Sequence, residues 1–391
     1  MLKHQEEFNP QKLRILFYIA FLLSLVSALF AYLRSSYIER FISLKNLGFI
    51  FVLIYFITFL AINNLSRIIK KYGKYRTLLI LLISNTIVLF LLTIFQEYWL
   101  GFLFSIFHLI VLWVIWIVHD IFVEKYSIDT ITGKIRGLEY TIINLGWIIS
   151  PFLAGVLFEK YGFPFIFLIL AFLTFLATLS FGFTFKKDRS EEYFFTYRFF
   201  SLLKEVYFRQ KSIFKVLCIS FLLEFFYSWM VIYTPLHLRT LGMSWSEIGT
   251  AFTIMLLAFL LFQYPAGWLA DKYLGEKELI SSGFIIMALI TSILFFVDSP
   301  SFTIWAILLF LTRIGAALVE ILSVSYFFKQ IDRRDINLVI LFRNILPLAY
   351  IVSSSIAVFV LYFFPLKFLF LFLALFMSSG LLFSLTLKDT K

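Results

Sequence analysis

Long uninterrupted runs of apolar residues alternate with short polar segments along almost the whole chain. A helix needs about 20 apolar residues to cross a membrane, because the hydrocarbon core is about 30 Å thick. The runs are far too long for the strands of a membrane barrel. The pattern therefore predicts transmembrane helices at 13–33, 46–66, 76–95, 99–121, 137–158, 163–185, 213–236, 246–264, 278–297, 301–326, 336–361 and 365–387.

A longer polar segment, 186–212, separates these twelve runs into two sets of six. Within it, polar residues recur at helical spacing opposite a row of apolar ones, which predicts an amphipathic helix lying in the membrane interface. A flexible tether is the alternative. We therefore expect an all-α integral membrane protein with two pseudo-symmetric six-helix bundles. Its N-terminal bundle is 1–185, its interdomain segment is 186–212 and its C-terminal bundle is 213–391.

Composition supports a membrane location. Of the 391 residues, 62% are hydrophobic and only 15% are charged, whereas soluble domains are about half apolar and about a quarter charged. The net charge of +11 does not indicate nucleic-acid binding, because most Lys and Arg residues fall in the loops of one side. Positive residues mark the cytoplasmic side, so the sequence predicts a multi-pass protein of the cell membrane with both termini cytoplasmic. The first run is too long for a cleaved signal peptide.

The two halves also share landmarks. Asp120 and Tyr126 near the end of the fourth run match Glu320 and Tyr326 in the tenth run at one constant offset. At the same offset, Asn144 matches Asn344. Such self-similarity indicates an internal repeat of two related halves.

Two six-helix halves in one orientation, joined by a cytoplasmic segment, resemble the plan of the major facilitator superfamily. The loop "GWLADKYLGEK" (267–277) is similar to a loop motif of that family, and "LSRIIKKYGKYR" (65–76) is a degenerate first-half copy. The resemblance implies a cytoplasmic gate, and an ordinary tight loop is the alternative. The positions that fill the two motifs are Gly267, Asp271, Lys272, Gly275 and Lys277, and Lys70, Gly73, Lys74 and Arg76.

The fifth run contains "GWIISPFLAG" (146–155), which is similar to a Gly- and Pro-rich motif of exporters in this superfamily. Gly146, Pro151 and Gly155 match it, while Ser150 stands where Gly is usual. The resemblance implies export. Small residues at this spacing also let membrane helices pack closely, so plain helix packing is the alternative.

Among the charged residues within the apolar runs are Glu224, Arg313 and Glu320. Arg313 lies roughly 18 Å along the tenth run and Glu224 roughly 15 Å along the seventh, so both are near the membrane midplane. Glu320 lies two turns from Arg313 on nearly the same helix face. An isolated charge at this depth costs about 3 kcal/mol or more, so these side chains must face water or each other.

In the superfamily that the chain resembles, the first, fourth, seventh and tenth spans line a central cavity. The resemblance thus places Glu224, Arg313 and Glu320 along a solute path. We expect Glu224 and Glu320 to carry protons, with Asp120 as a third candidate, and Arg313 to bind an anionic group or to pair with Glu224. A structural ion pair between the two helices is the alternative, and Asp120 is equally suited to pair with Lys70 or Lys71.

Three further polar residues complete the candidate site. His119 titrates near neutral pH when solvated, although a lone buried histidine is more often structural. Asn144 and Asn344 are expected to hydrogen-bond a solute or to join helices.

No enzyme site is predicted. With one Cys and four dispersed His residues, the chain offers no metal-binding set, and it has no phosphate-binding loop. No cofactor is expected. The sequence therefore predicts a monomeric secondary active transporter that moves a small solute by alternating access in contact with membrane lipid, through proton-coupled efflux. Proton-coupled uptake of a polar or anionic nutrient, and a non-transporting sensor or scaffold, are the alternatives.

Overall fold

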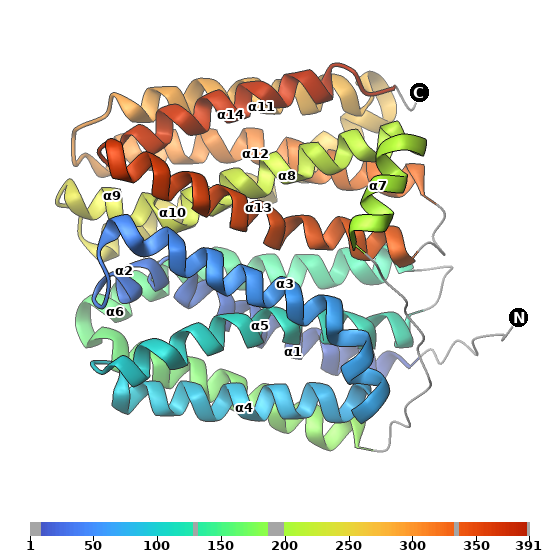
Figure 1. Ribbon diagram of the computed structural model, residues 1–391, viewed down its shortest axis with the longest axis vertical. Helices are drawn as coiled ribbons and strands as arrows, with labels where there is room; N and C mark the ends of the chain where they lie inside the picture. Colours follow the sequence, from blue (N-terminus) through green and yellow to red (C-terminus); the bar gives the residue numbers. More distant parts are fainter. Residues whose placement is uncertain (1–8, 128–131, 187–198, 332–335, 389–391) are drawn as a thin grey trace, which may run out of the picture. The chain divides into compact units, whose positions relative to one another are not determined.

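The computed structural model describes residues 9–127, 132–186, 199–331 and 336–388. In these residues the chain is helical and has no strand (Figure 1), which confirms the predicted all-α class. The helices are α1 (Pro10–Ala31), α2 (Arg34–Glu39), η1 (Leu44–Asn46), α3 (Leu47–Tyr72), α4 (Lys74–Phe95), α5 (Trp99–Tyr126), α6 (Thr132–Phe185), α7 (Phe199–Arg209), α8 (Lys211–Ile232), α9 (Thr234–Thr240), α10 (Trp245–Leu269), η3 (Ala270–Leu274), α11 (Glu276–Phe295), α12 (Phe302–Gln330), α13 (Ile336–Phe363) and α14 (Phe368–Ser384).

The helices reproduce the predicted membrane spans. In the described residues, 10 helical segments are long and apolar enough to cross a membrane. One of them is α6, which is broken at Gly162, where φ is 71°, and so holds two spans. The apolar helix α14, with 17 residues, supplies one more. The predicted set of twelve spans is therefore confirmed.

The chain groups into two compact units, which we call unit 1 (1–33 and 60–196) and unit 2 (34–59 and 197–391). The first half of α3 belongs to unit 2 because it packs closely on α13. A Cβ atom at Gly48 would lie 2.7 Å from the carbonyl oxygen of Ser354, and the rings of Tyr55 and Tyr350 are 4.4 Å apart. The division into six-helix domains at 186–212 stays a prediction.

The predicted amphipathic helix lies partly in the described residues, as α7. It buries Phe199 and Val206, and Phe199 contacts Phe59 at a ring distance of 5.1 Å. Phe200 and Phe208 remain exposed, at 73% and 65%. Phe195 and Arg198 lie outside the described residues, and the location of α7 in the membrane interface stays a prediction.

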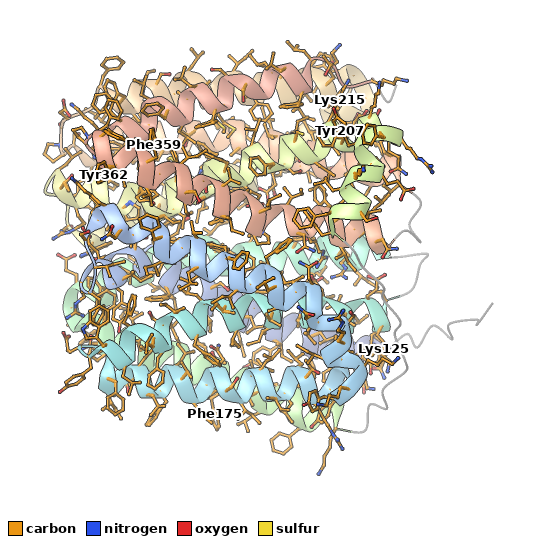
Figure 2. The ribbon with its side chains drawn as sticks, viewed as in Figure 1. Lys125, Phe175, Tyr207, Lys215, Phe359 and Tyr362 are labelled. Carbon is orange, nitrogen blue, oxygen red and sulfur yellow. The ribbon has the colours of Figure 1, made fainter. Side chains whose placement is uncertain are left out.

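Large apolar side chains cover the outer surfaces of both units. Phe175 of unit 1 is 45% exposed on such a face. In unit 2, exposed Tyr207 lies at one end of the helices and exposed Phe359 and Tyr362 lie at the other (Figure 2). Aromatic residues concentrate at both membrane interfaces, so this arrangement is typical of a helical membrane protein.

Small residues bring helices together in both units. In unit 1 the most extensive helix packing joins α1 to α6, and a Cβ atom at Gly146 would collide with the side chain of Ser24. In unit 2, a Cβ atom at Gly315 of α12 would lie 2.5 Å from the carbonyl oxygen of Gly283 in α11. In lipid the hydrophobic effect does not drive helices together, so close van der Waals packing of their backbones stabilises the contact instead.

Two loop glycines at matched motif positions share one backbone conformation. Gly73 precedes α4 with φ 81° and ψ 152°, and Gly275 precedes α11 with φ 78° and ψ 173°. This region of φ and ψ is essentially restricted to glycine. The match agrees with the repeat inferred from the sequence.

We predict that Gly315→Ala destabilises the protein by about 1–3 kcal/mol, because the new methyl group meets backbone atoms of α11 that cannot move aside. Gly182→Ala in α6 is the control, since its Cβ atom would meet only Leu79 at 3.6 Å. Thermal unfolding of the detergent-solubilised protein measures both. Equal unfolding temperatures for the two variants would contradict the close α11–α12 contact.

We also predict that Gly275→Ala lowers stability by about 1–3 kcal/mol, since alanine is strained at this backbone conformation. Gly267→Ala in the same motif should have little effect, because a Cβ atom there meets nothing within 4 Å. The same unfolding assay compares them, and a destabilised Gly267→Ala beside an unaffected Gly275→Ala would overturn the assignment.

Candidate functional site

Four polar side chains of unit 2 gather where α8 packs against α12. Glu224 and Tyr227 are three residues apart on α8, and Arg313 and Glu320 are seven apart on α12, so each pair shares one helix face. The Tyr227 hydroxyl donates a hydrogen bond to Glu320 Oε2 at 2.9 Å. Glu224 interacts electrostatically with Glu320 as well. Three of these four residues are predicted from the sequence, and Tyr227 is not.

Glu224 and Tyr227 lie on α8, which is the most buried of the candidate spans in the described residues, with 78% of its most apolar stretch inside the protein. Even so, Glu224, Tyr227 and Glu320 are only half-buried. Carboxylates in the middle of a membrane are tolerated where they reach water or a partner. Glu320 meets that condition through its hydrogen bond with Tyr227.

The Arg313 guanidinium has aromatic neighbours in place of a carboxylate partner. Its Cζ atom lies 5.0 Å from the ring centre of Phe226 and 5.3 Å from that of Tyr227. The side chain is 2% exposed, and its Nε and Nη1 atoms are buried without a hydrogen-bond partner. Aromatic faces stabilise a cation without using its N–H groups, so these donors remain free for an anion.

The expected ion pair between Arg313 and Glu224 is not found among the described residues. Arg313 interacts instead with Glu320, from a distance beyond that of a salt bridge, and Glu224 also faces Glu320. Equal depth in the membrane was the basis of the expected pair, but Arg313 lies against the rings of Phe226 and Tyr227 of α8.

A second polar group lies in unit 1, between the end of α5 and the start of α6. Arg136 Nη1 contacts Asp120 Oδ1 at 3.1 Å and Glu139 Oε2 at 2.8 Å, and its Nη2 contacts Glu124 Oε2 at 3.0 Å. One guanidinium therefore holds three carboxylates. Beside it, His119 Nε2 lies 3.0 Å from the carbonyl oxygen of Leu16.

His119 and Asp120 of this group are predicted site residues, whereas Arg136 and Glu139 are not predicted. Their spacing was the available signal, since residues three apart share a helix face and they follow Asp120 and Glu124 closely in the sequence. The atoms of His119, Asp120 and Glu139 lie within 4.8 Å of one another, close enough to hold a metal ion. Arg136 already occupies two of these carboxylates, which makes a second cation unfavourable there.

The two predicted asparagines and the motif of the fifth run all lie within helices. Asn344 donates to the carbonyl oxygen of Ile340 in its own helix at 3.1 Å, and Asn144 is half-buried on α6. In the fifth-run motif, Ser150 donates to the carbonyl oxygen of Gly146 at 2.7 Å. Pro151 and Gly155 are buried with it, so the motif packs α6 against its neighbours.

The motif at 267–277 is only partly described, because the side chain of Asp271 lies outside the described residues. Lys272 rests on the ring of Trp268 at 5.0 Å, and Gly275 makes the turn before α11. Next to it, the buried Glu276 forms an ion pair of 2.6 Å with Lys329 of α12. The gate role of this motif, and of Lys277, Lys70, Lys74 and Arg76, stays a prediction.

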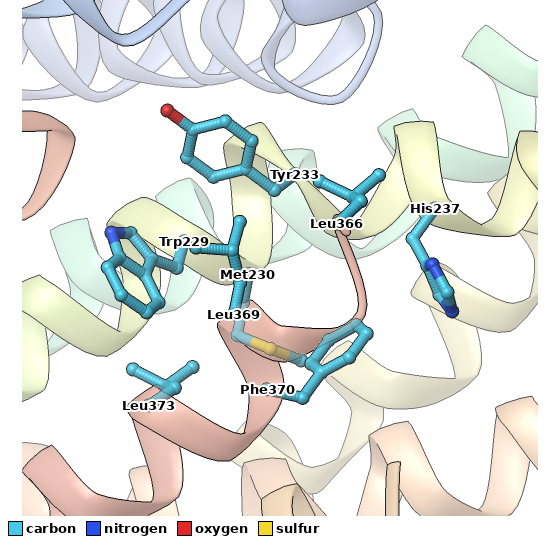
Figure 3. A pocket seen from close by; sticks show the side chains of 8 residues that line it. All are labelled: Trp229, Met230, Tyr233, His237, Leu366, Leu369, Phe370 and Leu373. Carbon is cyan, nitrogen blue, oxygen red and sulfur yellow. The ribbon is translucent and has the colours of Figure 1, made fainter. Parts of the chain in front are cut away.

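Glu224, Arg313 and Glu320 do not line either of the following two hollows in the described part of unit 2. The first is a cavity of about 10 Å³ lined by Trp229, Tyr233, His237 and Phe370 among others (Figure 3), which is room for about one water molecule. The second is an open cleft of about 340 Å³ that includes Glu39, Arg239 and Trp245. Partial burial raises the pKa of Glu39.

Comparison with known proteins agrees with this architecture. The solved crystal structure of the POT family transporter PepTSo is similar, with a TM-score of 0.76 and 15% sequence identity over 96% of this chain and 97% of that chain. No curated protein sequence matches the chain. The family model of the Major Facilitator Superfamily matches residues 15–246 and 216–391. The chain therefore belongs to the Major Facilitator Superfamily and is a multi-pass membrane protein of the transporter class.

Proposed function

We propose that this protein is a proton-coupled secondary transporter that moves a small solute by alternating access. The observation that supports the proposal is the group of Glu224, Tyr227, Arg313 and Glu320 on two packed helices. Ionisable residues within membrane spans are costly, and they are typical of solute paths and proton relays.

In this proposal Glu320 and Glu224 carry the proton. Two ionised carboxylates near each other repel, and a proton on either one relieves the repulsion. Tyr227 donates to Glu320 and so stabilises its ionised form. A conformational change that moves α8 along α12 would break this bond and favour proton uptake by Glu320.

Export is the proposed direction, because the fifth span carries the exporter-like motif with Gly146, Pro151 and Gly155. Uptake of an anionic solute is the second candidate, and it is favoured by the unpartnered N–H groups of Arg313. We further propose that the protein is a monomer of the cell membrane with both termini cytoplasmic, as the loop charges indicate.

We predict that Glu320→Gln reduces solute-driven proton movement at least about tenfold, which corresponds to about 1.4 kcal/mol. Proteoliposomes with a trapped pH-sensitive dye, exposed to a panel of solutes, measure the proton flux. Glu278→Gln, at an exposed position of α11, is the control and should behave like the unmodified protein. If no solute moves protons in either direction through the unmodified protein, coupled transport is excluded and a sensor or scaffold becomes the better explanation.

We predict that Arg313→Ala weakens the binding of anionic solutes by about 1.5–3 kcal/mol, since it removes charge-assisted hydrogen bonds. Arg313→Lys should recover only part of the affinity, because lysine keeps the charge but loses the planar fork. Thermal-shift measurements with anionic, neutral and cationic solutes test both variants. The control is Arg209→Ala, at a side chain that is 79% exposed. Unchanged anion binding in Arg313→Ala would exclude Arg313 as the anion site.

A further inference from the structure

The ring of His119 in unit 1 is held in one tautomer by the backbone of α1. Its Nε2 atom lies 3.0 Å from the carbonyl oxygen of Leu16. A carbonyl oxygen only accepts hydrogen bonds, so Nε2 must carry the hydrogen. In a neutral imidazole the other nitrogen, Nδ1, then has no hydrogen and acts as an acceptor.

This acceptor faces a second acceptor. His119 Nδ1 lies 3.7 Å from Glu139 Oε1, and the two side chains are 0% and 3% exposed. Neither atom has a hydrogen-bond partner. An ionised carboxylate only accepts hydrogen bonds, so a neutral His119 and an ionised Glu139 would place two lone pairs opposite each other in a buried site. Buried polar atoms are seldom left in this state.

The charged groups described around the pair carry more negative than positive charge, so an added proton is favourable there. On α6, Arg136 holds the other oxygen of Glu139, and it also binds Asp120 and Glu124 of α5. From α1, Leu16 contributes only its carbonyl group, while the Lys12 ammonium is bound to the hydroxyl of Tyr126 at 2.9 Å. One guanidinium thus faces three carboxylates in the described part of the site.

We propose that His119 and Glu139 together form a binding site for one exchangeable proton inside unit 1. The proton is taken up from hydronium in the solvent, which is left as water, and it lies between His119 Nδ1 and Glu139 Oε1, where it turns two facing acceptors into a donor and an acceptor. The hydrogen bond that forms draws the two atoms to about 2.7–2.9 Å. No other bond is made or broken.

This site is separate from the acids Glu224 and Glu320 of unit 2, and it does not depend on the proposed transport function. It connects three helices, because His119 lies on α5, Glu139 on α6 and Leu16 on α1. Proton binding therefore strengthens a junction in unit 1, and proton loss places like acceptors face to face and loosens it.

Nuclear magnetic resonance of the full-length protein in lipid nanodiscs, labelled with ¹⁵N-histidine, tests the proposal. Substitution of His4, His108 and His237 by glutamine, one at a time, assigns the signal of His119. Across a pH titration, we expect the Nδ1 signal of His119 or an infrared band of protonated Glu139 to report one proton that is released as the pH rises.

Glu139→Gln should abolish this titration, because its amide N–H can satisfy His119 Nδ1 without a proton. Glu124→Gln is the matched control, since it removes another carboxylate from Arg136 at a side chain that is 58% exposed, and there the titration should persist. The proposal fails if His119 stays neutral and Glu139 stays ionised throughout the titration of the unmodified protein. It also fails if Glu139→Gln leaves the titration of His119 unchanged. The measurement on the unmodified protein decides the matter even if a variant does not fold, and it remains valid if no solute is transported.

Discussion

The cost of removing a charge from water is the constraint on which the polar architecture of this protein depends. The two units meet it in different ways. In unit 1, three carboxylates surround Arg136, so its N–H groups are used. In unit 2, the aromatic faces of Phe226 and Tyr227 accompany Arg313 and leave N–H groups available. The first arrangement is typical of a structural junction, and the second is typical of a site that is completed by a ligand.

Close packing of helices supports both arrangements. Lipid is as apolar as the helix surfaces, so helices associate through close contact and hydrogen bonds more than through the exclusion of water. In unit 2, Trp229 donates to the carbonyl oxygen of Ser353 at 2.8 Å, and the hydroxyls of Ser353 and Ser228 are 2.7 Å apart. These contacts join α8 to α13 and so fix the face of α8 that carries Glu224 and Tyr227.

Hydropathy alone predicted all twelve spans, because the thickness of the bilayer limits the length of an apolar run. Charge partners were harder to predict. Depth along a helix placed Arg313 and Glu224 at one level, yet the sequence does not reveal how each helix is rotated about its axis. Asp120 and Glu124 reach Arg136 from a second helix, and the hydrogen bond of Tyr227 crosses from α8 to α12, so neither contact follows from spacing within one helix. The repeat, in contrast, was visible in Asp120 and Glu320, which lie in polar groups of both units.

The glycine turns before α4 and α11 have kept one backbone conformation in both halves of the chain. The first-half copy of the loop motif has Leu65 and Ile69 where the second half has Gly267 and Asp271, yet Gly73 and Gly275 have almost the same dihedral angles. Side-chain chemistry has drifted while the bend of the main chain has been kept. Ancestry in such duplicated proteins is therefore better traced through positions that only a residue without a side chain can fill than through their charges.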